Sequence, residues 1–389
     1  MRLHNETRRG EAGQSREKVL FVSLILLVVM FAATSFVSSA FHSTESGLAR
    51  RWAARGDASL RDGRVESALE EYRSALVYDP GNFQTQFHLA QALAKSGYAD
   101  QASGYLLNLL GEAPNSGEVN LELAHLAAKA GRADEAIGYY HAAIYGQWSN
   151  DTLEVHREAR FELAEYLLSV NQKQLALAEI MELTTRVSDE DAANLILVGN
   201  LFLRAGGPER ALHEFTLALK DEPENARALF GAGQAEFQLG ANAQAVDYLS
   251  KGQRVGGSDA AMEQMLEKAR TILEIDPYAP DLTERERARR AARAFEEALS
   301  SVEDCAQKSG ISLSSDAPSS DLASAYAAAD SKRLEWSEKQ LQHQPEMIDA
   351  AMGMVFRMEG LAASKCGPPQ GGASLGLLLL AQQRGSQNQ

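Results

Sequence analysis

The sequence has few of the residues that would mark several common classes of protein. It holds only two cysteines in 389 residues, which excludes a disulfide-rich scaffold. Basic residues are outnumbered, with 38 Lys and Arg against 53 Asp and Glu and a net charge of −15. That balance argues against a nucleic-acid binder, because phosphate contacts need clustered cations. The hydrophobic fraction of 45% is nevertheless ample for a core, so a wholly disordered chain is excluded.

Motifs that carry chemistry are also missing from the sequence. The eight histidines are scattered and form no His-Glu-x-x-His or Cys/His ligand spacing. No phosphate-binding loop or Gly-x-Ser-x-Gly elbow occurs, and Gly231-Ala232-Gly233 lacks the third glycine of a dinucleotide loop. We therefore predict no catalytic residue, no metal, no cofactor and no small-molecule substrate, and we expect a protein that is not an enzyme.

One long apolar run lies near the N-terminus. Residues 19–41 contain no charge and, as a helix, would reach about 35 Å, enough to cross a bilayer. We interpret this segment as a transmembrane signal anchor, because it is longer than the apolar core of a signal peptide. A cleaved signal peptide is the alternative, since Ser38-Ser39-Ala40 offers small residues of the kind that signal peptidase recognises.

Charge on the two sides of this run indicates its orientation. The first 18 residues hold five basic and three acidic residues, net +2, so the remaining 371 residues carry −17. The positive-inside rule then places the N-terminal tail in the cytoplasm and the large acidic part outside it. We predict a single-pass membrane protein, of the bacterial inner membrane with its main domain in the periplasm if the source is Gram-negative.

Residues 49–259 repeat with a period of 34 residues. Gly63, Gly97 and Gly131 are 34 residues apart, and small and proline positions recur at the same spacing. A period of this length indicates stacked helical hairpins. The first unit, which begins at Ala49, has its marker residues at positions 4, 8, 20, 24, 27 and 32, namely Trp52, Gly56, Ala68, Tyr72, Ala75 and Pro80.

These marker positions resemble those of the tetratricopeptide repeat. Small residues at positions 8 and 20 let the two helices approach closely, glycine at position 15 forms the turn, and proline near position 32 ends the second helix. The weakest unit has Asn171 in place of the turn glycine, which an αL-tolerant asparagine can replace. A generic helical bundle is the alternative. The predicted units are 49–82, 83–116, 117–150, 157–190, 192–225 and 226–259.

The resemblance implies an all-α fold, a right-handed α-solenoid whose first helices line a concave groove. In the family, positions 5 and 9 of each unit contribute to that groove. After Ala53, position 5 is apolar throughout: Phe87, Leu121, Phe161, Ile196 and Phe230. After Asp57, position 9 is polar throughout: Gln91, His125, Glu165, Asn200 and Gln234. Such a surface suits an extended or helical peptide, although ordinary core packing would also explain the apolar stripe.

One specialised peptide site is unlikely on the same resemblance. The clamp that co-chaperone members of the family use for a C-terminal carboxylate needs Lys and Asn at certain groove positions. Other residues stand there in this sequence, namely Ala53, Asp57, Gln84, His88, Glu118 and Glu122. We therefore do not expect a C-terminal carboxylate as the ligand.

The region after the repeats is expected to be helical. Residues 258–274 form an amphipathic helix that would cap the last repeat, and a second helix of about 282–309 begins with interleaved Arg and Glu. A Ser-rich linker follows, and then two helices of about 321–342 and 345–365. The predicted organisation is a cytoplasmic basic tail 1–18, an anchor 19–41, repeats 49–259, capping and long helices 260–309, a linker 310–320, and a C-terminal helical hairpin with tail 321–389.

Both cysteines fall in this last region. Cys305 and Cys366 lie near the ends of predicted helices, and in an oxidising compartment they could form a disulfide. Two unrelated buried thiols are the alternative.

Two functions remain from the sequence. The first is a membrane-anchored scaffold that mediates protein–protein interaction outside the cytoplasm and holds peptide segments of a partner. The alternative is an accessory or catalytic subunit of an enzyme acting on envelope polymers, with any activity in residues 275–389. The identity of the partner does not follow from the sequence.

Overall fold

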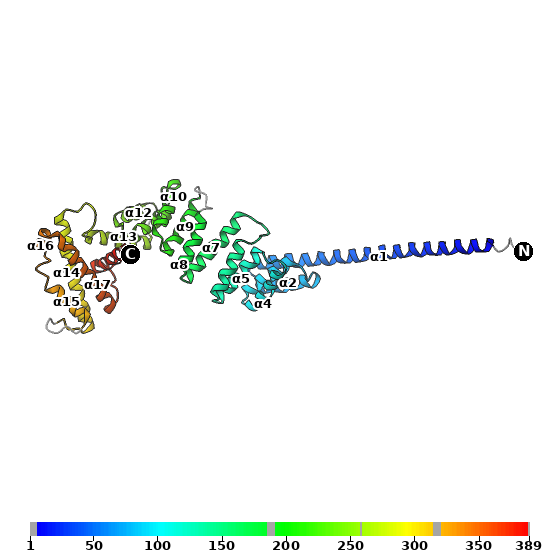
Figure 1. Ribbon diagram of the computed structural model, residues 1–389, viewed down its shortest axis with the longest axis horizontal. Coiled ribbons are helices and arrows are strands. Elements are labelled where there is room, and N and C mark those ends of the chain that lie inside the picture. The colour runs from blue at the N-terminus through cyan, green and yellow to red at the C-terminus, as the bar shows by residue number, and fades with distance from the viewer. Residues whose placement is uncertain (1–5, 185–190, 257–258, 314–319, 388–389) are drawn as a thin grey trace. The chain divides into compact units, whose positions relative to one another are not determined.

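The computed structural model describes residues 6–184, 191–256, 259–313 and 320–387. Every named element in these ranges is a helix, joined by short turns. The chain divides into two compact units, residues 1–163 and 164–389 (Figure 1). The all-α repeat architecture expected from the 34-residue period is present in both units.

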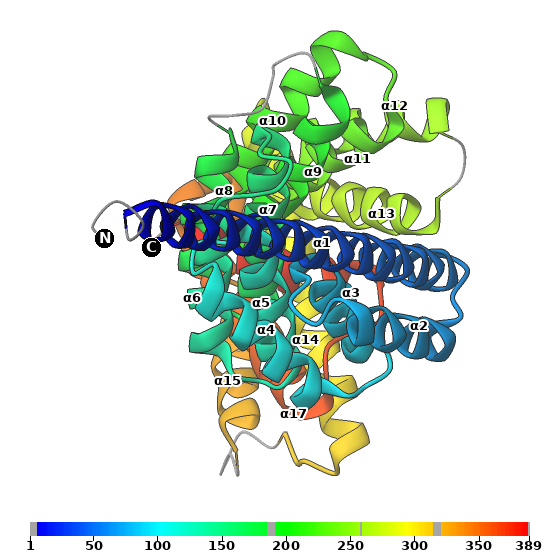
Figure 2. The same ribbon diagram turned by 90° about the vertical axis from the view of Figure 1, so that its right-hand side faces the viewer.

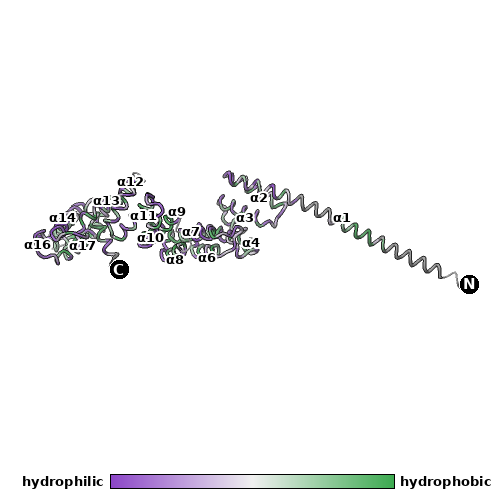
Figure 3. Tube along the Cα trace, turned by 90° about the horizontal axis from the view of Figure 1, so that it is seen from above, coloured by the Kyte–Doolittle hydropathy of each residue, from purple (hydrophilic) through white to green (hydrophobic). Residues whose placement is uncertain are grey.

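The first unit begins with a single helix, α1, that runs from Glu6 to Arg61. It therefore joins the predicted tail, the predicted anchor and the first helix of the first repeat without a break. The large apolar side chains Phe21 and Leu24–Phe31 are at least half exposed, and this stretch is the green part of α1 in Figure 3. The predicted span 19–41 falls partly on side chains outside those described, and among the described residues no helix has the length and hydropathy needed to cross a bilayer.

Helical hairpins follow α1 at the predicted period. Helix α2 packs against the end of α1 and against α3 (Figure 2). The turn glycines Gly63, Gly97 and Gly131 have φ values of 76°, 85° and 72°, so each occupies the left-handed region that favours glycine. The further helices of this unit, before α7 (Leu153–Ser169), are α2 (Val65–Tyr78), α3 (Phe83–Lys95), α4 (Ala99–Glu112), α5 (Gly117–Lys129) and α6 (Ala133–Ile144).

The second unit continues the hairpins. Asn171 has φ of 59°, which confirms that an asparagine replaces the turn glycine of the fourth repeat. Residues 185–190, at the end of that predicted repeat, lie outside the described residues, as do the last repeat's residues 257–258. The helices are α8 (Lys173–Thr184), α9 (Ala192–Ala205), α10 (Pro208–Asp221), α11 (Ala226–Gln238) and α12 (Asn242–Gly256).

Close packing of small residues against aromatic rings holds the hairpins together. The ring of Phe215 on α10 is fully buried and lies against Gly199 of α9 and Gly231 of α11, where an added Cβ would come within 2.8 Å and 2.3 Å of it. A Cβ added to Gly56 would likewise come within 2.5 Å of the ring of Tyr72. Any larger residue at these glycines would overpack the seam, and at Gly56 and Gly199 this explains the small residue expected at position 8.

A second helical body follows the repeats. Helices α14, α15, α16 and α17 (Figure 1) share one hydrophobic core. In this core Phe295 and Trp336 pack edge to face, with ring centroids 5.1 Å apart. The elements are α13 (Ala260–Ile275), α14 (Glu284–Ser309), α15 (Asp321–Asp330), α16 (Glu338–His343), the 3-10 turn η1 (Pro345–Met347), α17 (Ile348–Cys366) and α18 (Gly372–Gln387).

This body differs from the sequence expectation in two places. The predicted single helix 321–342 is wrong, because the chain turns between α15 and α16 so that Trp336 reaches the core. The predicted tail after the hairpin contains the 16-residue helix α18, which packs on α13. Residues 314–319 of the predicted linker lie outside the described residues.

Hydrogen bonds to the last repeat hold α18 in place. Gln383 is 9% exposed, and its amide donates to the carbonyl of Phe237 at 2.7 Å. Asn242 at the start of α12 donates to the side-chain oxygen of Gln383 at 3.1 Å. The C-terminal helix thus covers the end of the repeat stack together with α13, whereas the sequence analysis assigned that role to residues 258–274 alone.

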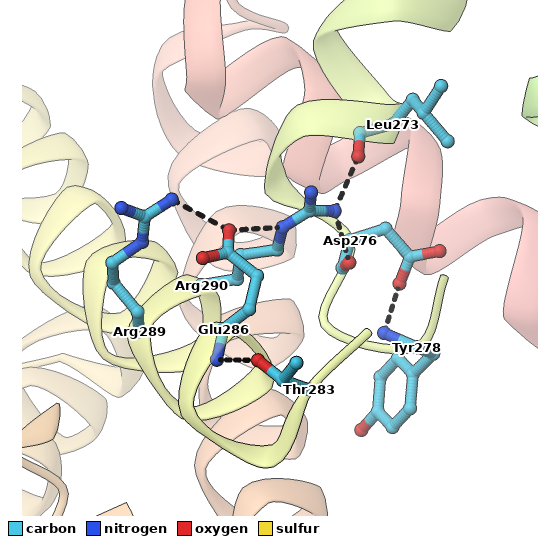
Figure 4. Close-up of polar contacts among 7 residues, drawn as sticks. All are labelled: Leu273, Asp276, Tyr278, Thr283, Glu286, Arg289 and Arg290. Atoms are coloured by element: carbon cyan, nitrogen blue, oxygen red, sulfur yellow. Dashed lines mark hydrogen bonds and ion pairs between the residues drawn. The ribbon is translucent and has the colours of Figure 1, made fainter. Parts of the chain in front are cut away.

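Arg290 near the start of α14 fastens this helix to the end of α13 (Figure 4). Arg290 donates to the carbonyls of Leu273 and Asp276 at 2.6 Å and 3.1 Å, so it satisfies acceptors left open at the end of α13. Glu286 accepts from both Arg289 and Arg290, and these bonds lower its pKa. These two arginines therefore serve internal contacts.

The two cysteines form a disulfide that joins α14 to α17. Cys305 and Cys366 have Cα atoms 5.9 Å apart and lie 61 residues apart in the sequence. The disulfide lies at one end of the core of the C-terminal body, where α17 ends and the loop to α18 begins.

Candidate peptide-binding face of the repeats

The apolar residues at position 5 of the repeats fall into two groups. Phe87 is 7% exposed and Ile196 is 3% exposed, so both belong to the packed interior. Leu121, Phe161 and Phe230 are half-buried, and Phe230 packs against a cluster formed by α12 and α13. Core packing thus accounts for part of the stripe, and the half-buried members leave some apolar surface at the edge of the first helices.

The polar residues at position 9 contact the next repeat in the first unit. Gln91 donates to Glu122 at 2.6 Å, and His125 bonds to Glu162 at 2.5 Å between its Nε2 and the carboxylate oxygen. Asp57, at position 9 of the first repeat, accepts from Nδ1 of His88 at 2.8 Å.

Each of these three bonds joins position 9 of a repeat to position 6 of the following repeat. We call this series the polar ladder. Gln84 extends it by bonding to Nε2 of His88 at 2.7 Å. The sequence contains this signal, because polar residues stand at both positions in successive repeats.

The second unit departs from this pattern. Position 9 residue Glu165 pairs instead with Arg204, at position 13 of the next repeat, with a shortest distance of 2.6 Å. Asn200 is exposed and Gln234 is half-buried, and Gly231 occupies the position 6 that would face Asn200. The structure therefore does not continue the polar ladder through repeats five and six.

Charge within the ladder is concentrated at His125. Hydrogen bonds to Glu122 and Glu162 outweigh the effect of burial and raise the pKa of His125 to about 9. Burial alone would raise the pKa of Glu122, but hydrogen bonds from His125 and Gln91 bring it below its usual value. At neutral pH the centre of the ladder is thus a charged imidazolium between carboxylates.

A hollow of about 290 Å³ lies at the start of the ladder. The Tyr72 hydroxyl forms part of its wall and donates to Asp57 at 2.8 Å, and burial together with this bond raises the pKa of Tyr72 well above its ordinary value. The exposed cations Arg61 and Lys95 stand at its edge. The full lining is Asp57, Leu60, Arg61, Tyr72, His88, Gln91 and Lys95.

Only part of this lining is predicted by the sequence. Gln91 was a groove candidate, and Asp57 and His88 were considered only as departures from the carboxylate clamp. Leu60, Arg61 and Lys95 were missed, although they occupy positions 12 and 13 of their repeats, which line the groove in the family. Reading those positions as well would have found the hollow.

Chemically, the hollow offers hydrogen-bonding groups and positive charge beside a small apolar surface. Asp57 accepts hydrogen bonds from both Tyr72 and His88, so the carboxylate of the hollow already has partners within the wall. Within the described ranges, no group of three or more His, Cys, Asp or Glu side chains is arranged to hold a metal ion.

Comparison with known families agrees with the repeat geometry. Residues 59–121 and residues 198–260 each match a family model described as tetratricopeptide repeat. The chain therefore contains tetratricopeptide repeats in both of its units. No curated protein matches the chain.

Several solved structures are similar to the chain. One is YrrB, described as a TPR protein with an unusual peptide-binding site, at 16% identity over 51% of this chain and 97% of that chain, with a TM-score of 0.40. Another is PilF of Pseudomonas aeruginosa, at 16% identity over 57% and 97% of the two chains, with a TM-score of 0.41. A third is a tetratricopeptide repeat protein of Parabacteroides merdae, at 16% identity over 64% and 92%, with a TM-score of 0.41.

Proposed function

We propose that this tetratricopeptide-repeat protein is a non-enzymatic scaffold that holds a peptide segment of a partner protein on the first helices of its repeats. The observation that carries the proposal is the hollow lined by Asp57, Tyr72, His88 and the two cations at its edge. Tetratricopeptide repeats serve protein–protein interaction generally, and this hollow is a part of the first-helix surface where hydrogen-bonding and charged groups converge.

The chemistry of the hollow favours a particular kind of segment. Asp57 is already bonded to Tyr72 and His88, so its negative charge is compensated within the wall. Arg61 and Lys95 are exposed and remain available to acceptors on a ligand. An extended segment with an acidic side chain, which also presents backbone carbonyls, would match this arrangement.

A charge-reversal experiment tests this assignment. Lys95→Glu should abolish recovery of the partner in a mild-detergent pull-down with the full chain, because it replaces the proposed cation with a repelling carboxylate. Arg73→Glu is the matched control, since Arg73 is also exposed, on α2, but does not line the hollow. Equal recovery with both variants would contradict the assignment, provided that both melt like the wild type.

We also propose that residues 19–41 anchor the protein in a membrane, with the repeats outside the cytoplasm. Exposed apolar side chains between Phe21 and Phe31 support an anchor, because such a surface is unfavourable in water. The disulfide between Cys305 and Cys366 supports an oxidising compartment.

Fractionation separates this proposal from its alternatives. Full-length protein should stay in the membrane pellet after extraction with alkaline carbonate, whereas a variant lacking residues 19–41 should be released. External protease should digest the repeats in spheroplasts while cytoplasmic marker proteins survive. Release of the wild type by carbonate, or protection of its repeats in spheroplasts, would contradict the proposal.

A further inference from the structure

A row of cations crosses the first helices of the first three repeats. Arg61, Lys95 and Lys129 each stand at position 13 of a repeat, and each is the last residue of its helix, α1, α3 or α5. All three residues are exposed. None of them donates a hydrogen bond to, or forms an ion pair with, another residue that the structure describes. We call these three residues the basic row.

Stabilisation of helix ends does not account for the basic row. A cation in the last turn of a helix interacts favourably with the helix dipole, and this applies equally to both helices of a hairpin. The second helices α2 and α4 nevertheless carry no basic residue in their last turn, and α6 carries only His141 there. Among these described helices, terminal lysine and arginine are therefore confined to the first helices, which carry the polar ladder.

Carboxylates of the polar ladder are already engaged. Asp57 accepts hydrogen bonds from Tyr72 and His88, and Glu122 accepts one from Gln91. The cations of the basic row lie on the same first helices but take no part in these bonds. They are therefore available to carboxylates that a ligand brings.

Helix packing sets the spacing of the basic row. Helix α3 packs against both α1 and α5. The ladder bonds from Asp57 to His88 and from Gln91 to Glu122 both join residues 31 apart in the sequence, so the two steps share one geometry. Because the axes of packed helices lie about 8–10 Å apart, equivalent positions on successive first helices are separated by about the same distance.

A polyproline II segment matches this spacing. It has three residues per turn and a rise of about 3.1 Å per residue, so every third side chain lies on one side, about 9 Å from the previous one. Side chains on one face of a β-strand recur instead about every 7 Å. An α-helix needs about seven residues for the same step, and its backbone groups are bonded internally. Polyproline II leaves those groups free to bond with the polar ladder.

On the basis of the peptide-binding function already proposed, we propose that the basic row binds a polyproline II segment with an acidic side chain at every third residue. Three successive carboxylates would pair with Arg61, Lys95 and Lys129 in turn. Arg61 and Lys95 border the hollow, whereas Lys129 does not. Lys129 therefore extends the contact beyond the hollow and fixes the register of the segment.

Three blocked peptides of identical composition test the register. They are Glu-Pro-Pro-Glu-Pro-Pro-Glu, which we call the spaced peptide, Pro-Glu-Pro-Glu-Pro-Glu-Pro and Glu-Glu-Glu-Pro-Pro-Pro-Pro. In fluorescence anisotropy with the full chain in detergent at low ionic strength, the spaced peptide should bind about fivefold more tightly than its isomers. A helical alanine-based peptide with Glu at every seventh residue should bind more weakly than the spaced peptide. Equal binding of the isomers, no binding by any of them, or tighter binding by the helical peptide would overturn the inference.

A charge swap tests the assignment of the two ends of the row. Lys129→Glu should weaken binding of the spaced peptide about fivefold, and Lys in place of the Glu at one end of that peptide should restore it. Arg61→Glu should be restored only by Lys at the opposite end. Rescue of both variants by the same peptide, or of neither variant by either peptide, would overturn the inference.

Two further variants separate this inference from the proposed function. Arg73→Glu is the matched control, because Arg73 is exposed on α2 outside the basic row, and it should bind the spaced peptide like the wild type. Unchanged binding in Lys129→Glu together with loss in Lys95→Glu would overturn the three-cation register. The same result would leave the peptide site at the hollow intact, since Lys95 lines the hollow and Lys129 does not.

Discussion

The tightest seam of the second unit predicts the effect of a single added methyl group. Phe215 is fully buried, and its ring lies against both Gly231 and Gly199. In Gly231→Ala the new Cβ would lie 2.3 Å from both Cε1 and Cζ of that ring. Such a separation is far below van der Waals contact, so either the ring or the helix α11 must move.

The magnitude follows from two opposing effects. Overpacking a closely packed core costs about 1–3 kcal/mol, whereas alanine is more favourable than glycine inside a helix by about 0.5–1 kcal/mol. We therefore expect Gly231→Ala to lower the free energy of unfolding by about 1–2 kcal/mol. Gly353→Ala is the matched control, because Gly353 lies in helix α17 and nothing stands within 4 Å of its added Cβ. That variant should be more stable than the wild type by about 0.5–1 kcal/mol.

Urea unfolding followed by circular dichroism measures both changes as shifts of the midpoint in opposite directions. Hydrogen exchange should place the loss in Gly231→Ala at α10 and α11. A smaller side chain in Phe215→Leu should recover part of the loss when combined with Gly231→Ala. The packing account would be refuted if Gly231→Ala were as stable as Gly353→Ala.

Three further predictions rest on other contacts. Reducing the disulfide between Cys305 and Cys366 should destabilise the C-terminal body by about 4 kcal/mol, because it frees a loop of about 60 residues in the unfolded chain, and hydrogen exchange of α17 measures this. Because the folded pKa of His125 is raised to about 9, its contribution to stability is complete below about pH 6.5 and is lost as the pH rises through 9. The melting temperature should therefore fall less between pH 6.5 and pH 9.5 in His125→Gln than in the wild type. Gln383→Ala should destabilise the docked helix α18 by about 1–3 kcal/mol, since Asn242 loses its buried partner, and exchange rates in α18 would show it.

The repeats were predictable because their signals are local. A turn glycine such as Gly97 marks the left-handed conformation between two helices, and Asn171 adopts the same conformation for the same reason. The small residues at position 8 reflect contacts within a repeat or with its neighbour, at fixed sequence distance. The 34-residue period therefore predicts both the positions of the turns and the positions of the closest packing contacts.

The C-terminal body was less predictable because its signals are not local. No glycine or proline interrupts residues 321–342, so the sequence predicts one continuous helix. The chain instead turns so that Trp336 packs on Phe295 of a different helix. Glu359 likewise stands in an ordinary helical sequence, and only packing of α14 and α18 around it buries its carboxyl group.

The candidate peptide-binding face falls between these cases. Family positions 5 and 9 lie on the same first helices as most of the hollow, but exposure at position 5 varies from buried Phe87 to half-buried Leu121, and this depends on neighbouring side chains. The bond between Gln91 and Glu122 follows a fixed step of 31 residues and could have been predicted from the repeat frame. The hollow itself depends on Tyr72 of the second helix, which a reading of the first helices alone does not include.

Site-specific photo-crosslinking tests the central claim most directly. A photoreactive amino acid would replace Lys95 at the edge of the hollow, or Gln101, which is exposed on α4 and does not line it. After irradiation of native membranes, the account predicts a discrete partner adduct from position 95, absent from position 101 and lost when Arg61→Glu is added. Adducts of equal yield from both positions would contradict the claim that the first helices of the repeats hold the partner.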